Sequence, residues 1–272
     1  MTIIEDAAVE VLLNADRNLS LSGYTSILTE IRLALEEVDR LAIPTRSPRL
    51  DWAVQSLSGS QKLRIILAPQ EIPSHRPPNT IALASNGFVA GIGELHQEPA
   101  IPPLFSARTV ERVQKVGDHM VKERLRDIKL TQLGRCQMNA IIDTQTVDKA
   151  KQAVRPAQRA WGSVTGKVEV LVARNEQHPK AQIVVEGTRR AVDIRGNAEH
   201  RDALRDAWGR RVMAGGELTR NSLGQPVRLS LTELHVLPEK DSSLTAWDIL
   251  GMAPSATGEL TTTQYMDLLR RD

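Results

Sequence analysis

The stretch that decides the fold of the second half of the chain is GRRVMAGGELTRNSLGQPVRLSLTELHVLPE, residues 209–239. Apolar and polar residues alternate on both sides of Asn221–Gly224, which predicts two antiparallel strands joined by a turn. The alternation shifts near Thr232–Glu233, so we expect a β-bulge there and His235 on the outer face. The side chains predicted to face a core are Val212, Leu218, Val227, Leu229 and Leu231.

Three more strands and one helix are predicted before this hairpin. The segments GSVTGKVEVLVA, AQIVVEG and RRAVDIRG alternate with a period of two, as half-buried strands do. NAEHRDALRDAWG (197–209) changes to a helical period, with Asn197 as the expected cap and Gly209 as the left-handed end. This order of elements over residues 157–240 predicts an OB-like five-stranded β-barrel. The first of these strands is predicted to bury Val164, Gly166, Val168, Val170 and Val172.

The first half of the chain is predicted to be a mixed α+β domain. Proline fixes the backbone and lacks an N–H donor, so proline-rich segments are expected to be loops at 43–49, 71–79 and 97–103. Between the loops, apolar spacing predicts strands near 7–14 and 134–142, a hairpin over 49–69, and helices over 24–41, 80–95, 106–125 and 145–154. The chain is therefore predicted to be an α+β protein with a domain over 1–156, a barrel over 157–240 and a tail over 241–272.

The bulk composition is that of a water-soluble globular protein, with 41% hydrophobic and 25% charged residues and a net charge of +2. The single cysteine, Cys136, excludes an internal disulfide and a Cys-rich metal site. The N-terminal MTIIEDAAVEVLLNA lacks the features of a signal peptide, and no apolar run reaches the roughly 18 residues of a membrane span. We therefore expect a cytoplasmic protein without a membrane partner.

No motif in the sequence predicts catalysis. The six histidines are dispersed without metal-ligand spacing, and no serine lies in a G-x-S-x-G motif. GFVAGIG (87–93) lacks the Lys-Ser/Thr of a phosphate loop and lies in a helical pattern, so small-residue helix packing is the better interpretation. Cys136 is expected to be a buried structural thiol. We expect no catalytic residue, no metal and no cofactor, and an enzyme is the least favoured class.

Basic residues are enriched in the predicted barrel. Between Arg159 and Lys240 there are 14 Lys and Arg against 10 Asp and Glu, whereas the tail from Asp241 has 2 against 5. No aromatic residue follows Trp161 in the predicted strands, although base stacking usually supports single-strand binding. As an alternative function, these basic residues are therefore predicted to bind DNA or RNA through its phosphates. The other interpretation left open is that they form an ordinary solvated surface. The candidate contacts at strand ends and turns are Arg189, Arg190, Arg195, Arg210, Arg211, Arg220 and Arg228.

The tail holds two short apolar clusters in WDILGMAPSATGELTTTQYMDLLRRD, residues 247–272. The first cluster is Trp247, Ile249 and Leu250, and the second is Tyr265, Met266, Leu268 and Leu269. A helix this short is marginal in water, so each cluster is expected to dock on the barrel, on the first domain or on another protein.

This tail resembles the C-terminal ends of bacterial small-barrel proteins with an L-G-x-x-P…T-G-x-L-T/S-x-x-x-Y segment. Those proteins are similar to antitoxins of toxin–antitoxin pairs whose toxin is a PIN-domain ribonuclease. The resemblance also covers AWGRRVMAGGELTRNSLGQPVRL more loosely, and it does not cover the first 150 residues. The large N-terminal domain and the lack of a clear helix-turn-helix depart from the antitoxin pattern.

The resemblance implies a non-catalytic binding protein whose tail engages a protein partner. An arginine of such a tail can enter the acidic metal site of the toxin, because a guanidinium forms paired bonds to carboxylates. The alternative to partner binding that stays open is that the tail folds back on its own barrel. The residues implied in partner binding are Trp247, Leu250, Tyr265, Leu268, Leu269, Arg270 and Arg271.

Overall fold

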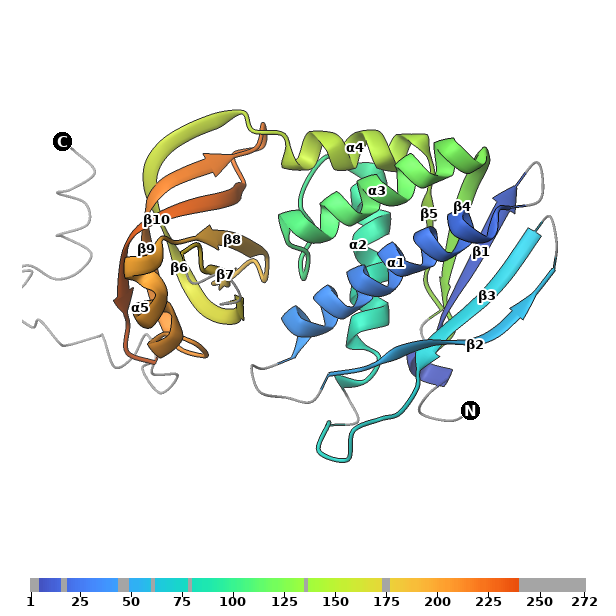
Figure 1. The fold of residues 1–272 in the computed structure, drawn as a ribbon, viewed down its shortest axis with the longest axis horizontal. Helices are drawn as coiled ribbons and strands as arrows, with labels where there is room; N and C mark the ends of the chain where they lie inside the picture. The colour runs from blue at the N-terminus through green and yellow to red at the C-terminus, as the bar shows by residue number, and fades with distance from the viewer. Residues whose placement is uncertain are drawn as a thin grey trace, which may run out of the picture. The chain divides into compact units, whose positions relative to one another are not determined.

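The computed structural model shows a mixed α+β fold with two five-stranded sheets, each with its own hydrophobic core (Figure 1). The described part of the chain up to Leu237 belongs to one compact unit. The tail predictions fall on residues outside the described ones, as does the prediction for Cys136. The described residues are 5–15, 19–43, 49–59, 62–77, 80–134, 137–172 and 177–239.

The first sheet is antiparallel throughout, in the order β2-β3-β1-β4-β5. Its helices pack together on one side of it (Figure 1). Val9, Val11 and Leu13 alternate along β1 and are fully buried in the shared core. In chain order the elements are η1 (Glu5–Ala7), β1 (Val9–Ala15), α1 (Leu21–Ala42), β2 (Trp52–Ser58), β3 (Lys62–Pro69), α2 (Leu83–Gln97), α3 (Ala107–Glu123), β4 (Leu125–Gln132), β5 (Asn139–Ile142) and α4 (Thr144–Val154).

The helix predicted over 106–125 is confirmed as α3, but no strand was predicted where β4 follows it. The helix ends at Glu123, because Arg124 takes a left-handed conformation with a φ of 56° and β4 starts at the next residue. Leu125 and Ile128 are three residues apart, and this spacing extends the helical pattern in the sequence. The predicted strand over 134–142 is correspondingly shorter and becomes β5.

The predicted small-residue packing of GFVAGIG is confirmed inside α2. A Cβ on Gly91 would overlap the ring of Phe105, which is fully buried, whereas a Cβ on Gly93 would meet nothing within 4 Å. Gly91→Ala is therefore expected to lower the free energy of unfolding by about 1–3 kcal/mol, the usual effect of overpacking a core.

Gly93→Ala is the matched control, because the same change on the same helix meets open space. It is expected to leave stability unchanged or raise it by up to about 1 kcal/mol, since alanine favours helix. Urea unfolding of both variants checks this. Equal destabilisation by the two substitutions would contradict the described packing of α2.

The second sheet contains the predicted strand, strand, strand, helix, strand, strand order. Its pairings run β10-β8-β7-β6-β9, and β9 also pairs with β10, so the strands form a closed ring. The β8–β10 pair is parallel and the other pairs are antiparallel. The elements are β6 (Gln158–Val172), β7 (Lys180–Val185), β8 (Ala191–Arg195), η3 (Ala198–His200), α5 (Arg201–Asp206), β9 (Arg211–Arg220) and β10 (Pro226–Val236).

The local signals of the opening stretch are confirmed. Gly209 and Gly224 have φ values of 76° and 74°, the conformation that glycine adopts without strain. The register of β10 shifts between Leu231 and Glu233, where the β-bulge was predicted. His235 is exposed, as expected, and lies 3.4 Å from a Glu233 oxygen.

The burial prediction for β6 was only partly right. Its register with β7 shifts between Val168 and Val170, so the alternation changes there. Leu171 packs against the second core, while Val170 and Val172 pair with Gln182 and Lys180 on the outer face. Val227, predicted to face the barrel interior, instead belongs to the core of the first sheet.

Candidate functional site

The turn between β9 and β10 is fixed to the N-terminal half of the unit. Asn221 is buried, and its Nδ2 donates to the carbonyl of Ala153 at 2.9 Å and to Gln225 Oε1 at 2.9 Å. Gln225 Oε1 also accepts a bond from the backbone N–H of Ile101 at 2.8 Å. This loop is therefore occupied by contacts within the chain.

The turn between β7 and β8 is fixed to the same half of the molecule. Arg190 Nε donates to the carbonyl of Ile101 at 2.6 Å, and the N–H of Ala191 donates to the carbonyl of Phe105 at 3.1 Å. A bridge between Ser106 and Ala191 places the first turn of α3 beside β8. As a result, α3 faces the outer surface of the second sheet.

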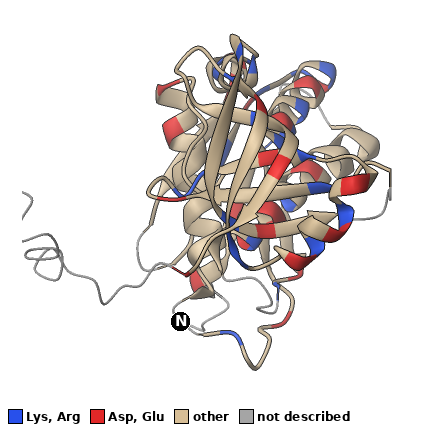
Figure 2. Cartoon of the chain, turned by 90° about the vertical axis from the view of Figure 1, so that its left-hand side faces the viewer, with Lys and Arg blue, Asp and Glu red and all other residues tan. Residues whose placement is uncertain are grey.

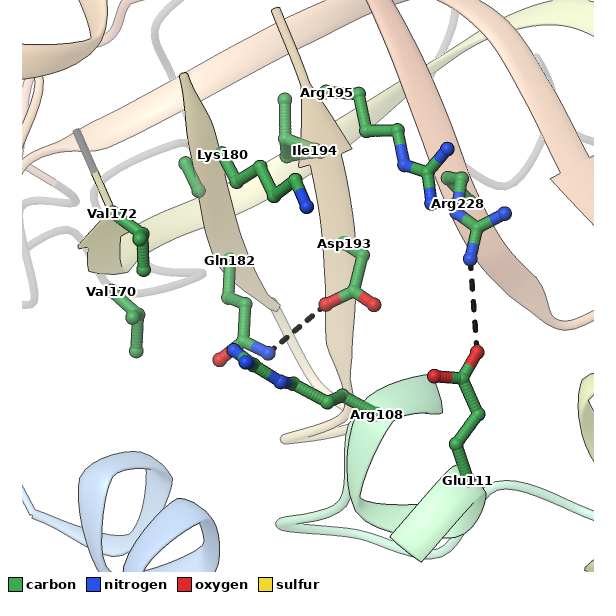
Figure 3. A pocket seen from close by; sticks show the side chains of 11 residues that line it. Arg108, Glu111, Val170, Val172, Lys180, Gln182, Asp193, Ile194, Arg195 and Arg228 are labelled. Carbon is green, nitrogen blue, oxygen red and sulfur yellow. Dashed lines mark hydrogen bonds and ion pairs between the residues drawn. The ribbon is translucent and has the colours of Figure 1, made fainter. Parts of the chain in front are cut away.

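A cleft of about 210 Å³ lies between that first turn and the outer face of β6, β7, β8 and β10 (Figure 3). We call it the α3 cleft. Figure 3 shows the side chains of Asp193 and Arg228 side by side on neighbouring strands, with Arg108 reaching towards Gln182 from α3. The lining residues are Arg108, Glu111, Val170, Val172, Lys180, Ala181, Gln182, Asp193, Ile194, Arg195 and Arg228.

Two cations of the cleft oppose each other directly. Lys180 and Arg195 are a register pair on β7 and β8, and both are exposed. Within the part of the chain that the structure describes, neither side chain makes an ion pair. Like charges at directly opposite positions destabilise a sheet, and a negative charge between the two side chains would relieve that repulsion.

The other two cations of the cleft are partly neutralised. Arg228 lies 3.7 Å from Glu111, and Arg108 lies 3.3 Å from the buried Glu37. Figure 2 shows acidic and basic residues interspersed over the molecule, in keeping with its small net charge. The cleft is thus distinguished by how its charges are arranged, not by the charge of the whole chain.

Asp193 is the acidic group of the cleft floor. Its Oδ1 accepts a hydrogen bond from Gln182 Nε2 at 3.0 Å. Burial raises the pKa of Asp193, and the nearby carboxylates of Glu111 and Glu37 raise it further, while Gln182 and Arg228 oppose the shift. The surroundings of Asp193 therefore disfavour its ionised form relative to solvent.

The α3 cleft continues in two directions. Beyond Lys180 and Arg195 it meets a hollow lined by His178 and Gly196. On the other side, Arg108 and Val172 are shared with a hollow along α1 that is lined by Leu33, Glu36, Arg40 and Arg112. Each of these two hollows therefore shares two lining residues with the α3 cleft.

The structure brings two of the predicted arginines together in the cleft, Arg195 and Arg228. Arg189 and Arg190 lie in the β7–β8 turn and bond towards the N-terminal half. Arg211 pairs with Glu186, Arg220 donates to the carbonyl of Gly224 at 2.8 Å, and Arg210 is exposed at the start of β9. Of the seven arginines predicted as phosphate contacts, two therefore lie in the cleft and five lie elsewhere.

Sequence reasoning missed Arg108, Lys180, Gln182 and Asp193. Three of these residues could have been assigned to the outer face from the sequence, because Lys180, Gln182 and Asp193 occupy the polar positions of two alternating strands. Arg108 carried none, since only the fold brings α3 to the second sheet.

The partner-binding residues predicted in the tail lie outside the described residues, so tail-mediated protein binding stays a prediction. No group of His, Cys, Asp or Glu suited to holding a metal ion occurs among the described residues. In the described ranges, no helix has both the length and the apolar character to cross a membrane.

A comparison with protein-family models and with curated proteins finds no match for this chain. The α3 cleft is therefore the candidate functional site because of its geometry and its charges.

Proposed function

We propose that the α3 cleft binds single-stranded nucleic acid through its phosphates. The observation that carries this proposal is the Lys180–Arg195 register pair on adjacent strands of the outer face, for which no ion pair occurs among the described residues. A phosphate placed between the two side chains relieves their repulsion and forms charge-assisted hydrogen bonds with both.

The strand arrangement supports the assignment of the second sheet as an OB-type barrel. Its first and fourth strands pair, its third and fifth strands pair in parallel, and α5 lies between the third and fourth. OB folds bind oligonucleotides on the face of the second and third strands. In this chain that face belongs to β7 and β8, which carry Lys180, Gln182, Asp193 and Arg195.

The chain departs from such barrels in one respect. The loop between the fourth and fifth strands usually contributes to binding, but here Asn221 and Gln225 hold it against the N-terminal half. The first turn of α3 forms the facing wall instead and brings Arg108 to the cleft. Among the described residues that line the cleft there is no aromatic side chain, so we infer backbone binding with little base stacking.

Fluorescence anisotropy of the intact chain with fluorescein-labelled oligothymidine (15-mer) tests the proposal. Each neutralised phosphate of a single strand contributes about −0.7 to the slope of log K against log salt. With two or three phosphates held in the cleft, we expect a slope of about −1.5 to −2. Lack of binding at low salt, or binding that ignores salt, would contradict the proposal.

A further inference from the structure

Phosphate binding leaves the carboxylate of Asp193 unused. It lies on the cleft floor, opposite Gln182 and Arg228 in the strand registers. A carboxylate repels phosphates, so the backbone of a bound strand passes along Lys180 and Arg195 and not over Asp193. The ligand group that contacts Asp193 must be a hydrogen-bond donor.

The Asp193 carboxylate has free hydrogen-bond acceptor sites that restrict which ligand groups it can bind. An ionised carboxylate only accepts, and its two oxygens offer about four lone-pair sites. Gln182 uses one of these sites on Oδ1. Arg228, in register with Asp193, brings a donor-only guanidinium to the same part of the cleft floor. The floor thus presents two acceptors beside a donor.

Among the bases, guanine has the complementary edge. Its N1–H and its 2-amino group are adjacent donors, and O6 beside them is an acceptor. Thymine and uracil present one N–H between two carbonyls, so they offer only one donor to the carboxylate. We propose that Asp193 is a specificity-determining residue that accepts both donors of an unpaired guanine, with Arg228 facing O6.

This inference rests on the proposed nucleic-acid binding, and the cost of the carboxylate supports it. Burial and the neighbouring acidic groups disfavour the ionised form of Asp193, as the raised pKa indicates. An asparagine of the same shape would avoid that cost. A perturbed carboxylate in a cleft is typical of functional sites.

The test compares anisotropy titrations of the intact chain with d(TG)6, d(TI)6 and d(T)12, where I is hypoxanthine, which lacks the 2-amino group. The alternating sequence offers a guanine in every second register. We expect d(TG)6 to bind about tenfold more tightly than d(TI)6, the order of one bidentate base contact. Asp193→Asn is expected to remove this preference and to leave the salt slope unchanged.

Two controls keep the result interpretable. Asp206→Asn changes an exposed carboxylate of α5 in the same way and is expected to keep the preference. The thermal midpoint of Asp193→Asn is expected not to fall, because the buried charge is removed, so a lost preference is not unfolding.

The contradicting outcomes are distinct. Equal binding of all three strands by the natural protein overturns guanine reading and leaves the proposed function standing. If r(UG)6 and r(U)12 both bind more tightly than their deoxy forms, and Asp193→Asn removes that difference, the carboxylate contacts the ribose 2′-OH and base reading is overturned. Binding of none of the strands overturns the proposed function and this inference together.

Discussion

Replacing Lys180 and Arg195 together by alanine is expected to weaken binding of the labelled oligothymidine by about 30- to 150-fold. Each cation is expected to contribute one charge-assisted contact to a phosphate, at about 1–1.5 kcal/mol. The slope of log K against log salt is expected to become less steep by about 1.4, because two fewer phosphates of a single strand are neutralised. Anisotropy titrations at several salt concentrations measure both quantities.

The matched control is Lys151→Ala with Arg155→Ala. It removes the same two charges from exposed positions at the end of α4, outside the cleft lining. Its affinity and salt slope are expected to stay close to those of the natural protein. If both double variants lose affinity equally, binding depends on net charge and the cleft is not the site.

The second large effect is expected from a buried ion pair in the N-terminal half. Arg76 and Asp39 are almost fully buried, with Nη2–Oδ1 and Nη1–Oδ2 distances of 2.6 and 3.1 Å. Asp39 Oδ2 also accepts from the N–H of Leu50 at 3.1 Å. Asp39→Ala leaves a buried guanidinium without this carboxylate, so we expect a loss of about 3–5 kcal/mol in the free energy of unfolding.

Urea unfolding followed by tryptophan fluorescence measures this loss, and the buried Trp52 lies on β2 two residues from Leu50. Glu10→Ala is the control, because it removes a carboxylate from a pair with the half-exposed Arg64. That change is expected to cost about 1 kcal/mol or less. Similar losses in both variants would show that the buried pair has no special role.

Features that depend on local chemistry could be predicted from the sequence. The β9–β10 hairpin follows from a period of two, a turn ending in Gly224 and a change of alternation at the bulge. The start of the helix predicted over 106–125 also has a local signal, because Ser106 makes a capping box at the start of α3.

Features that depend on long-range contacts could not be predicted. The α3 cleft needs the Ser106–Ala191 bridge and the Asn221–Ala153 bond, which join residues far apart in the sequence. The register shift after Val168 decides whether Val170 lines the core or the cleft, and no turn residue marks it. Arg76 lies in a proline-rich segment, where no periodicity indicates burial.

The central claim is that single-stranded nucleic acid lies in the α3 cleft. Photo-cross-linking of an oligonucleotide that contains 4-thiothymidine to the intact chain, with mass spectrometry of the linked peptides, tests it most directly. The account predicts cross-links in the first turn of α3 from Ala107 to Glu111, in β7 and β8, and in the start of β10 around Arg228. Cross-links confined to the first sheet or to residues 241–272 would contradict it.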